Sequence, residues 1–148
     1  MSKPILVTYE TTIHVRDTCM CLAVQRAARA LARRFDEAMR PFDLTNGQFS
    51  LLMSLNRPQP PNLSSVASLL AMDRTTLTAA LKPLERRNLV NVTPDPADKR
   101  SRLLSLTPEG MRLLSDVTPI WTSTHRELER QLGEGEHDRL LSSLTKLL

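Results

Sequence analysis

Two short helical segments joined by a tight turn constrain the fold of this chain more than any other feature. The run LSSVASLL follows Asn62, and only Ala71 and Met72 separate it from Asp73, which precedes RTTLTAALKPLERR. Asn and Asp suit the first position of a helix because their side chains accept free backbone N–H groups. Three leucines of the second segment recur at helical spacing and are expected to face a core: Leu77, Leu81 and Leu84. The pattern predicts a helix-turn-helix.

The residues that follow predict a β-hairpin. Asn88 suits the left-handed conformation that ends helices, and the β-rich runs LVNVT and RLLSL stand on either side of PDPADKRS. The connection is expected to be too long and too rich in proline for a two-residue hairpin loop. A helix-turn-helix with such a hairpin behind it is a winged helix, in which the hairpin forms the wing. Thr107 and Pro108 then suit the start of another helix.

The distribution of charge favours nucleic acid as a partner. The chain has a formal net charge of +4, and the segment from Asp73 to Arg102 holds seven Lys/Arg against four Asp/Glu. Basic and hydroxyl side chains of the second short helix are left for its exposed face: Arg74, Thr75, Thr78 and Lys82. At the wing tip, Lys99 and Arg100 can reach a DNA backbone or minor groove. Asp98 is expected to orient Arg100 through an ion pair.

Three stretches carry a resemblance to a known family. LTNGQFSLL, MDRTTLTAALKPLERRNLV and DPADKRSRLLSLTPEG stand in the order and spacing of the second helix, recognition helix and wing of the MarR family of transcriptional regulators, which the chain resembles over nearly its whole length. The resemblance implies a homodimer that represses transcription from a palindromic operator. It also implies eight DNA-binding residues by position: Arg74, Thr75, Thr76, Thr78, Lys82, Asp98, Lys99 and Arg100.

The predicted fold class is mainly α with a small β-hairpin wing, a winged helix-turn-helix with dimerisation helices at both ends. We expect residues 1–43 to form an N-terminal arm and dimerisation helix, and residues 44–107 the DNA-binding domain. Residues 108–148 are expected to form C-terminal dimerisation helices, because a leucine-rich last helix makes a poor exposed tail. Packing of that helix on its own domain is the alternative.

The resemblance implies that repression is relieved in one of two ways. The first is a small phenolic or aromatic carboxylate effector, for which five residues are candidates: His14, Arg16, Arg26, Phe49 and Met53. The second is oxidation of Cys21, which in CLAVQ stands near the reactive cysteine of the family's organic-hydroperoxide sensors, whose motif is Cys-Phe-Ala-Leu-Tyr. Gln25 replaces the tyrosine of that motif, so a buried and unreactive thiol is the favoured interpretation.

Other classes of function are not indicated. The chain has no phosphate-binding glycine loop and no histidine paired by motif with a nucleophile, so we expect no enzyme and no cofactor. His125 and His137 stand apart in the acidic tail, so we expect no metal site. No apolar run suits a signal peptide or a membrane span, so we expect a cytoplasmic protein. A protein-interaction adaptor that uses a winged helix without reading DNA is the alternative function.

Overall fold

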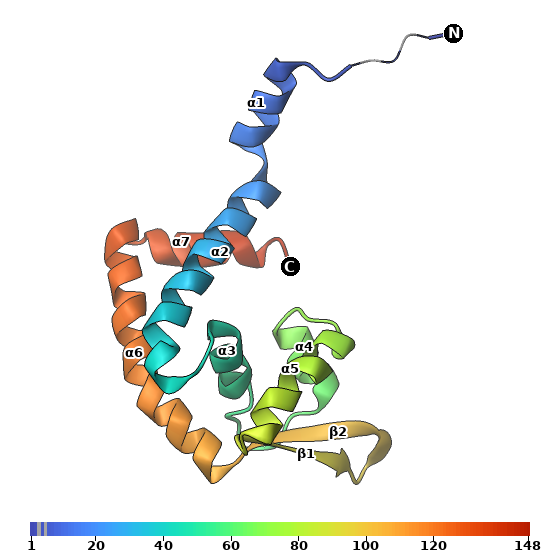
Figure 1. Ribbon diagram of the computed structural model, residues 1–148, viewed down its shortest axis with the longest axis vertical. Coiled ribbons are helices and arrows are strands. Elements are labelled where there is room, and N and C mark those ends of the chain that lie inside the picture. The colour runs from blue at the N-terminus through green and yellow to red at the C-terminus, as the bar shows by residue number, and fades with distance from the viewer. Residues whose placement is uncertain (3, 5) are drawn as a thin grey trace. The chain divides into compact units, whose positions relative to one another are not determined.

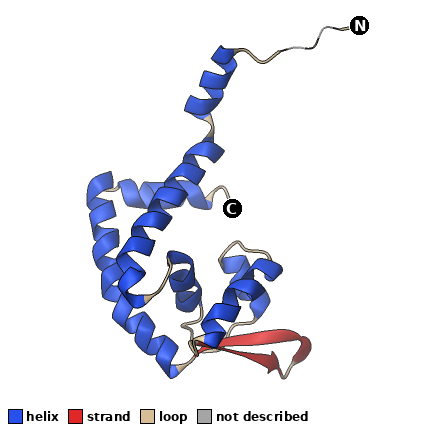
Figure 2. Cartoon of the chain, viewed as in Figure 1, coloured by secondary structure: helices blue, strands red, loops and turns tan. Residues whose placement is uncertain are grey.

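Helices make up most of the chain, and one β-hairpin interrupts them (Figures 1 and 2). The computed structural model describes residues 1, 2, 4 and 6–148. Its elements are α1 (Tyr9–Thr18), α2 (Met20–Met39), the 3-10 helix η1 (Arg40–Phe42), α3 (Asn46–Ser54), α4 (Leu63–Leu69), α5 (Arg74–Arg86), β1 (Val90–Asp95), β2 (Asp98–Leu106), α6 (Pro108–Leu132) and α7 (Glu136–Thr145). The predicted fold class is confirmed. Among the described helices, none is both long and apolar enough to cross a bilayer.

The described residues form two units, Met1–Arg34 and Phe35–Leu148, and the boundary falls within α2. In the first unit, α1 was not predicted from the sequence. Its N-cap is Thr8, whose side chain accepts the backbone N–H of Thr11, and the helix buries none of its residues. Because a helix with no buried face lacks a clear apolar stripe, hydrophobic periodicity does not reveal it.

The core of the second unit joins α3, α4, α5, the hairpin and the first half of α6. Leu77, Leu81 and Leu84 of α5 are all buried, as their spacing predicts. The largest fully buried side chains of the described residues are Met39, Leu52, Val66, Leu77, Leu84, Leu104 and Val117. The buried face of α5 therefore fixes which of its side chains remain on the outside.

Four helices of this unit begin at capping residues, and Asn62, Asp73 and Thr107 are confirmed as predicted caps. Thr45 and Gln48 form a capping box at α3, in which each side chain accepts the other residue's backbone N–H. The remaining caps are Asn62 for α4, Asp73 for α5 and Thr107 for α6. Each cap satisfies a backbone donor that the helix itself leaves free. These local interactions set the lengths of α4 and α5 and the turn between them.

The hairpin has a shorter loop than the sequence suggests. Only Pro96 and Ala97 lie between β1 and β2, so the expectation of a longer connection is wrong. Pro94 pairs with Arg102 inside the ladder, whereas Asp95 pairs with Asp98, so that residues 99–101 bulge from β2. The extra residues of the bulge lie in β2. The other strand, β1, therefore continues past Pro94 nearly to the turn.

The wing is anchored at its base by the start of α6. The Thr107 hydroxyl donates to the carbonyl of Asn88 at 2.6 Å and accepts the N–H of Gly110 at 2.9 Å. Asn88 has φ 57°, the left-handed conformation predicted for it. A Cβ on Gly110 would overlap the carbonyl oxygen of Leu89, so α6 packs this closely only because residue 110 is glycine.

Candidate nucleic-acid interface

The cap of α5 sets the exposed face of that helix. Asp73 Oδ1 accepts the backbone N–H of Thr76 at 2.7 Å, and Oδ2 accepts its hydroxyl at 2.9 Å. These hydrogen bonds, the backbone one first, lower the pKa of Asp73 below its ordinary value. The predicted DNA-binding residue Thr76 is exposed, but its hydroxyl is engaged at the cap.

The other four candidates on α5 lie together on one side of the helix. Arg74, Thr75, Thr78 and Lys82 are exposed and line one open hollow of about 360 Å³ with Leu63 and Ala79. The Thr78 hydroxyl donates to the carbonyl of Arg74 at 2.8 Å, which leaves the hydroxyl oxygen available as an acceptor. This α5 face, defined as Arg74, Thr75, Thr78 and Lys82, combines two positive charges with hydroxyl groups.

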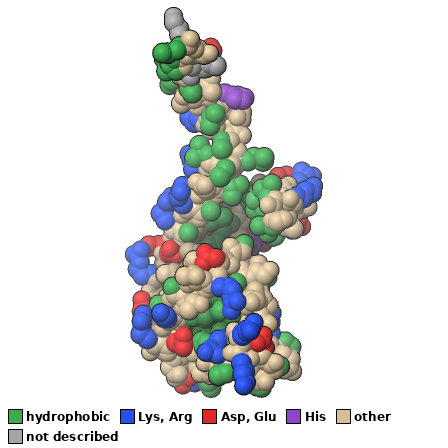
Figure 3. All heavy atoms as spheres, turned by 90° about the vertical axis from the view of Figure 1, so that its right-hand side faces the viewer, with side chains coloured by type: hydrophobic (Ala, Val, Ile, Leu, Met, Phe, Trp, Pro, Cys, Tyr) green, Lys and Arg blue, Asp and Glu red, His purple; other side chains and the backbone are tan. Residues whose placement is uncertain are grey.

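The wing presents a second group of basic side chains. Lys99 and Arg100 are exposed in the bulge of β2, and Arg102, which was not predicted, is exposed opposite Pro94. In the view of Figure 3, several Lys and Arg side chains lie close together on the lower part of the molecule, with Asp and Glu side chains among them.

Asp98 shapes the wing tip in a different way from the one expected. Its Oδ1 accepts the backbone N–H of Arg100 at 2.9 Å, and among the described residues no ion pair joins the two side chains. Asp95 makes the same kind of turn with the N–H of Ala97, also at 2.9 Å. Both carboxylates are thus used to fix the backbone of the loop, because aspartate readily accepts an N–H two residues on. Among the described residues the Arg100 guanidinium has no hydrogen bond or ion pair, so it is available to a ligand.

The predicted effector residues divide between the two units. Phe49 and Met53 lie in the second unit and line an apolar cavity of about 470 Å³ with residues of α3, α6 and the end of α4: Ser50, Ser54, Leu69, Leu70, Thr118 and Trp121. The rings of Phe49 and Trp121 stack with their centroids 6.3 Å apart. His14, Arg16 and Arg26 belong to the first unit, where Arg16 forms an ion pair with Asp17 at 2.7 Å.

Cys21 does not have the buried environment expected for it. In the single chain the residue is exposed, and its Sγ accepts a hydrogen bond from Gln25 Nε2 at 3.2 Å. Gln25, which replaces the tyrosine of the sensor motif, therefore supplies a donor to the sulfur. Cys19 is half-buried, and its Sγ accepts the N–H of Leu22 at 3.4 Å.

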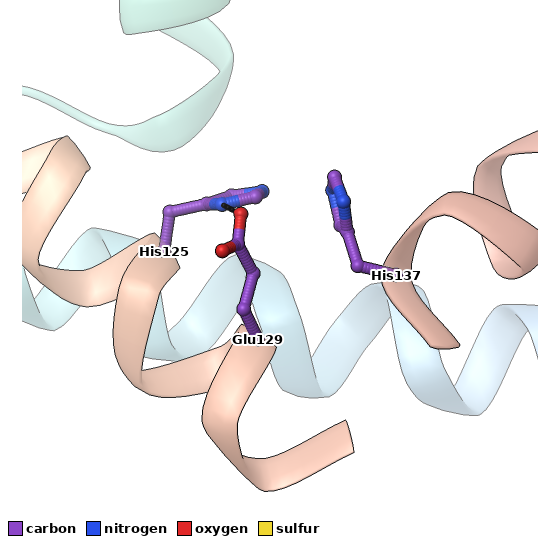
Figure 4. Close-up of side chains that lie close together, drawn as sticks. All are labelled: His125, Glu129 and His137. Carbon is purple, nitrogen blue, oxygen red and sulfur yellow. Dashed lines mark hydrogen bonds and ion pairs between the residues drawn. The ribbon is translucent and has the colours of Figure 1, made fainter. Parts of the chain in front are cut away.

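One cluster was missed by the sequence analysis. His125 and Glu129 of α6 lie beside His137 of α7, so the expectation that the two histidines stand apart is wrong (Figure 4). The spacing of His125 and Glu129, four residues apart on a helix, was the available signal. The position of His137 depends on the turn between the two helices, which the sequence pattern does not define.

The fold and this surface define a winged helix-turn-helix protein. A family model described as "MarR family" matches residues 44–101. The transcriptional regulator MosR of Mycobacterium tuberculosis, solved in complex with DNA, is 33% identical, with 87% of this chain and 92% of that chain covered and a TM-score of 0.78. The transcriptional repressor CouR, bound to a 23-mer DNA duplex, is 30% identical, with 97% and 99% covered and a TM-score of 0.79.

A third solved structure adds a ligand. BpsR of Bordetella bronchiseptica, whose DNA binding is regulated by 6-hydroxynicotinic acid, is 26% identical, with 88% of this chain and 93% of that chain covered and a TM-score of 0.78. The chain belongs to the MarR family and is a DNA-binding transcriptional regulator. The resemblance read from its sequence is thereby confirmed.

Proposed function

We propose that this regulator is a repressor that binds a palindromic operator as a homodimer, through the α5 face and the wing. The observation that carries the proposal is the gathering of Arg74, Thr75, Thr78 and Lys82 on one exposed face, in the same unit as the basic wing. The solved complexes of MosR and CouR with DNA support it, as does the repressor activity named for CouR.

Each group has a distinct role on DNA. The α5 face enters the major groove, where Arg74 donates to base edges or phosphates and Lys82 holds a phosphate. The hydroxyl of Thr78 already donates within the helix, so it acts toward DNA as an acceptor. Lys99 and Arg100 of the wing reach the adjacent backbone or minor groove, where negative potential attracts arginine. Thr76 serves mainly by holding the start of α5.

Exposed leucines support the homodimer. The last helix leaves Leu140 and Leu141 exposed, and the chain end adds Leu147 and Leu148. Contiguous exposed apolar side chains are unfavourable in water and are typical of surfaces that a partner covers. A second copy is the partner proposed, because a two-fold dimer presents two identical wings and recognition helices to the two halves of a palindrome.

The apolar cavity supports control by a small aromatic ligand. Phe49, Met53 and Trp121 provide an aromatic and polarisable wall, which suits a planar ring. None of the residues that line the cavity is charged, so a ligand carboxylate needs a cation from elsewhere. His14, Arg16 and Arg26 of the first unit remain the candidates that the sequence offers for ligand binding. The control of BpsR by an aromatic acid supports this class of ligand.

Oxidation of Cys21 is a second candidate trigger, favoured by the exposure of the thiol and by the donor that Gln25 supplies. An organic hydroperoxide would oxidise the thiol to a sulfenic acid and leave as the corresponding alcohol. The two triggers are distinguished by substitution, because Cys21→Ser removes only the second.

A fluorescence-anisotropy titration tests the proposal. Purified protein is added to labelled DNA from upstream of its own gene, at fixed salt and with scrambled competitor present. Binding that survives the competitor is expected, followed by release on addition of 6-hydroxynicotinic acid or a hydroxybenzoic acid. Met53→Trp, which fills the cavity, should keep DNA binding and lose the response to ligand. Binding no tighter than to scrambled DNA would favour the adaptor function.

A further inference from the structure

Three side chains that can bind a metal ion lie where α6 meets α7, next to Trp121 of the apolar cavity. The nitrogen and oxygen ligand atoms of His125, Glu129 and His137 all lie within 4.8 Å of one another (Figure 4). The side chains of the two histidines are about one quarter exposed, at 24% and 28%. The cluster is therefore partly shielded from water while it remains open to a small ion.

Two features of the chain bring these residues together: the helical spacing of His125 and Glu129, and the glycine turn before His137. His125 and Glu129 are four residues apart on α6, so they share one face of the helix, and His125 Nδ1 lies 3.0 Å from Glu129 Oε1. Gly133 and Gly135 then turn the chain with φ values of 97° and 77°, which glycine adopts without strain. This turn places His137, in the first turn of α7, with its ring centroid 4.9 Å from that of His125.

Neighbouring groups hold both imidazoles in place. The His125 ring stacks on the Trp121 ring, with the centroids 4.6 Å apart and the planes 22° from parallel. His137 Nδ1 lies 3.2 Å from Asp138 Oδ1. A carboxylate that accepts one ring N–H leaves the other nitrogen free with its lone pair, which is the arrangement common around histidine ligands of zinc. The His137 Nε2 atom is thereby prepared to bind a cation.

We propose that His125, Glu129 and His137 bind a divalent transition-metal ion of the Zn²⁺ type, with water in the fourth position. Two imidazoles and one carboxylate are a common zinc ligand set, and ligands of a tetrahedral zinc lie about 3.3 Å apart. The 3.0 Å between His125 Nδ1 and Glu129 Oε1 is close to that value, so the ion replaces the proton that these atoms share. A small rotation of His137 completes the site.

The surroundings permit entry of an ion and balance its charge. Glu129 and His137 line an open hollow of about 620 Å³, which gives the ion access from solvent. Two basic residues, Arg126 and Arg130, line the same hollow with two acidic ones, Glu134 and Asp138. The charges of these four residues cancel, so the carboxylate of Glu129 remains to offset part of the positive charge of the ion. A bound ion would join the end of α6 to the start of α7 across the glycine turn.

Titration of the full chain with ZnCl₂ tests the site, and the protein carries its own reporter. Trp121 is the only tryptophan in the chain and stacks directly on His125. We expect a saturable change in its fluorescence and one bound zinc per chain by equilibrium dialysis, both reversed by a chelator. Glu129→Gln and His137→Ala should each weaken binding by at least about tenfold, with the far-UV circular dichroism unchanged.

Matched variants exclude other zinc ligands. His14→Ala removes a histidine of the first unit, and Cys19→Ser/Cys21→Ser removes both thiols; each should bind zinc as the wild type does. Failure of the wild-type chain to bind zinc would overturn the proposal. So would zinc binding that persists in Glu129→Gln and His137→Ala but disappears with the thiols. Neither result depends on DNA binding, so the site is tested separately from the proposed function.

Discussion

The side chain of Asp98 binds the backbone of Arg100: Oδ1 accepts the Arg100 N–H at 2.9 Å, and the Arg100 guanidinium is left for other partners. The acidic residue thus fixes the path of the wing tip, and its charge is partly used in that hydrogen bond. This arrangement explains how an aspartate can stand beside a residue proposed to contact phosphate. In the wing tip, Asp98 fixes the backbone conformation, whereas the Arg100 side chain is proposed to bind DNA.

Removal of the Arg100 side chain should weaken DNA binding without changing the fold. Arg100→Ala is expected to lower the affinity for the operator by at least about tenfold, or about 1.4 kcal/mol, because a charged contact to DNA is lost. The affinity is measured by fluorescence anisotropy at physiological salt. Asp98→Asn is the control, since an amide oxygen still accepts the Arg100 N–H and the loop keeps its shape. Wild-type affinity in Arg100→Ala would refute the role of the wing.

A methyl group on Gly110 should destabilise the winged helix. Gly110→Ala places a Cβ against the carbonyl of Leu89, which also accepts the N–H of Thr107 at 3.0 Å. We expect the free energy of unfolding to fall by about 2 kcal/mol, as for an overpacked core. Gly47→Ala is the matched control, because the nearest atom to its new Cβ is Thr45 Oγ1 at 4.0 Å. Equal midpoints of urea unfolding for the two variants would contradict this account of α6 packing.

The stability of the fold should decrease in acid. Hydrogen bonds from Asn46 lower the pKa of Asp36, and hydrogen bonds from Thr76 lower the pKa of Asp73, in both cases below the ordinary value of 3.8. A lowered folded-state pKa contributes stability above the ordinary pKa, and this contribution is lost as the pH falls through the folded value. The free energy of unfolding should therefore decrease between about pH 5 and pH 2.

The substitution Asp73→Asn tests whether the ionisation of Asp73, and not its role as the cap of α5, contributes to the loss of stability in acid. Asparagine caps a helix as well as aspartate does but carries no charge, so the variant should unfold with a flatter dependence on pH than the wild type. Denaturant unfolding at several pH values measures the difference. An identical pH profile for the two proteins would show that Asp73 does not contribute to the acid sensitivity.

Arg87 should stabilise the end of α5. Its guanidinium donates to the backbone carbonyls of Asp43 at 2.6 Å and Phe42 at 3.4 Å, and so joins α5 to the turn before α3. Arg87→Met is expected to cost about 1 to 2 kcal/mol, because hydrogen bonds from a charged group are lost. The neighbouring Arg86→Met, at an exposed position, should change stability by less than about 0.5 kcal/mol. Similar losses in both variants would mean that only helix-terminal charge matters.

The sequence predicted those features that depend on neighbouring residues. Asp73 caps α5 and Leu77 faces the core because both interactions follow from helical geometry. The wing loop was predicted less well, since its length depends on a bulge that the side chains of Asp95 and Asp98 stabilise through backbone N–H groups. Periodicity contains no information on such bonds, so the register of the hairpin could not be derived from it.

The histidine cluster could not be derived for a different reason. His125 and His137 are twelve residues apart in the sequence, and the conformation at Gly133 and Gly135 is what places the first turn of α7 near the end of α6. Glycine allows many turns, so its presence does not specify which one forms. The cavity beside Phe49 likewise needs α3, α4 and α6 to be placed before its walls meet.

The most direct test of the central claim compares two double variants of equal charge on DNA. Arg74→Ala/Arg100→Ala removes two arginines from the α5 face and the wing, whereas Arg112→Ala/Arg126→Ala removes two exposed arginines from α6. Anisotropy titrations across a range of salt should show at least about a hundredfold loss of operator affinity and a shallower salt dependence for the first double variant. The second should stay close to the wild type. Equal losses in the two would contradict the proposed interface, because net charge alone would then explain the binding.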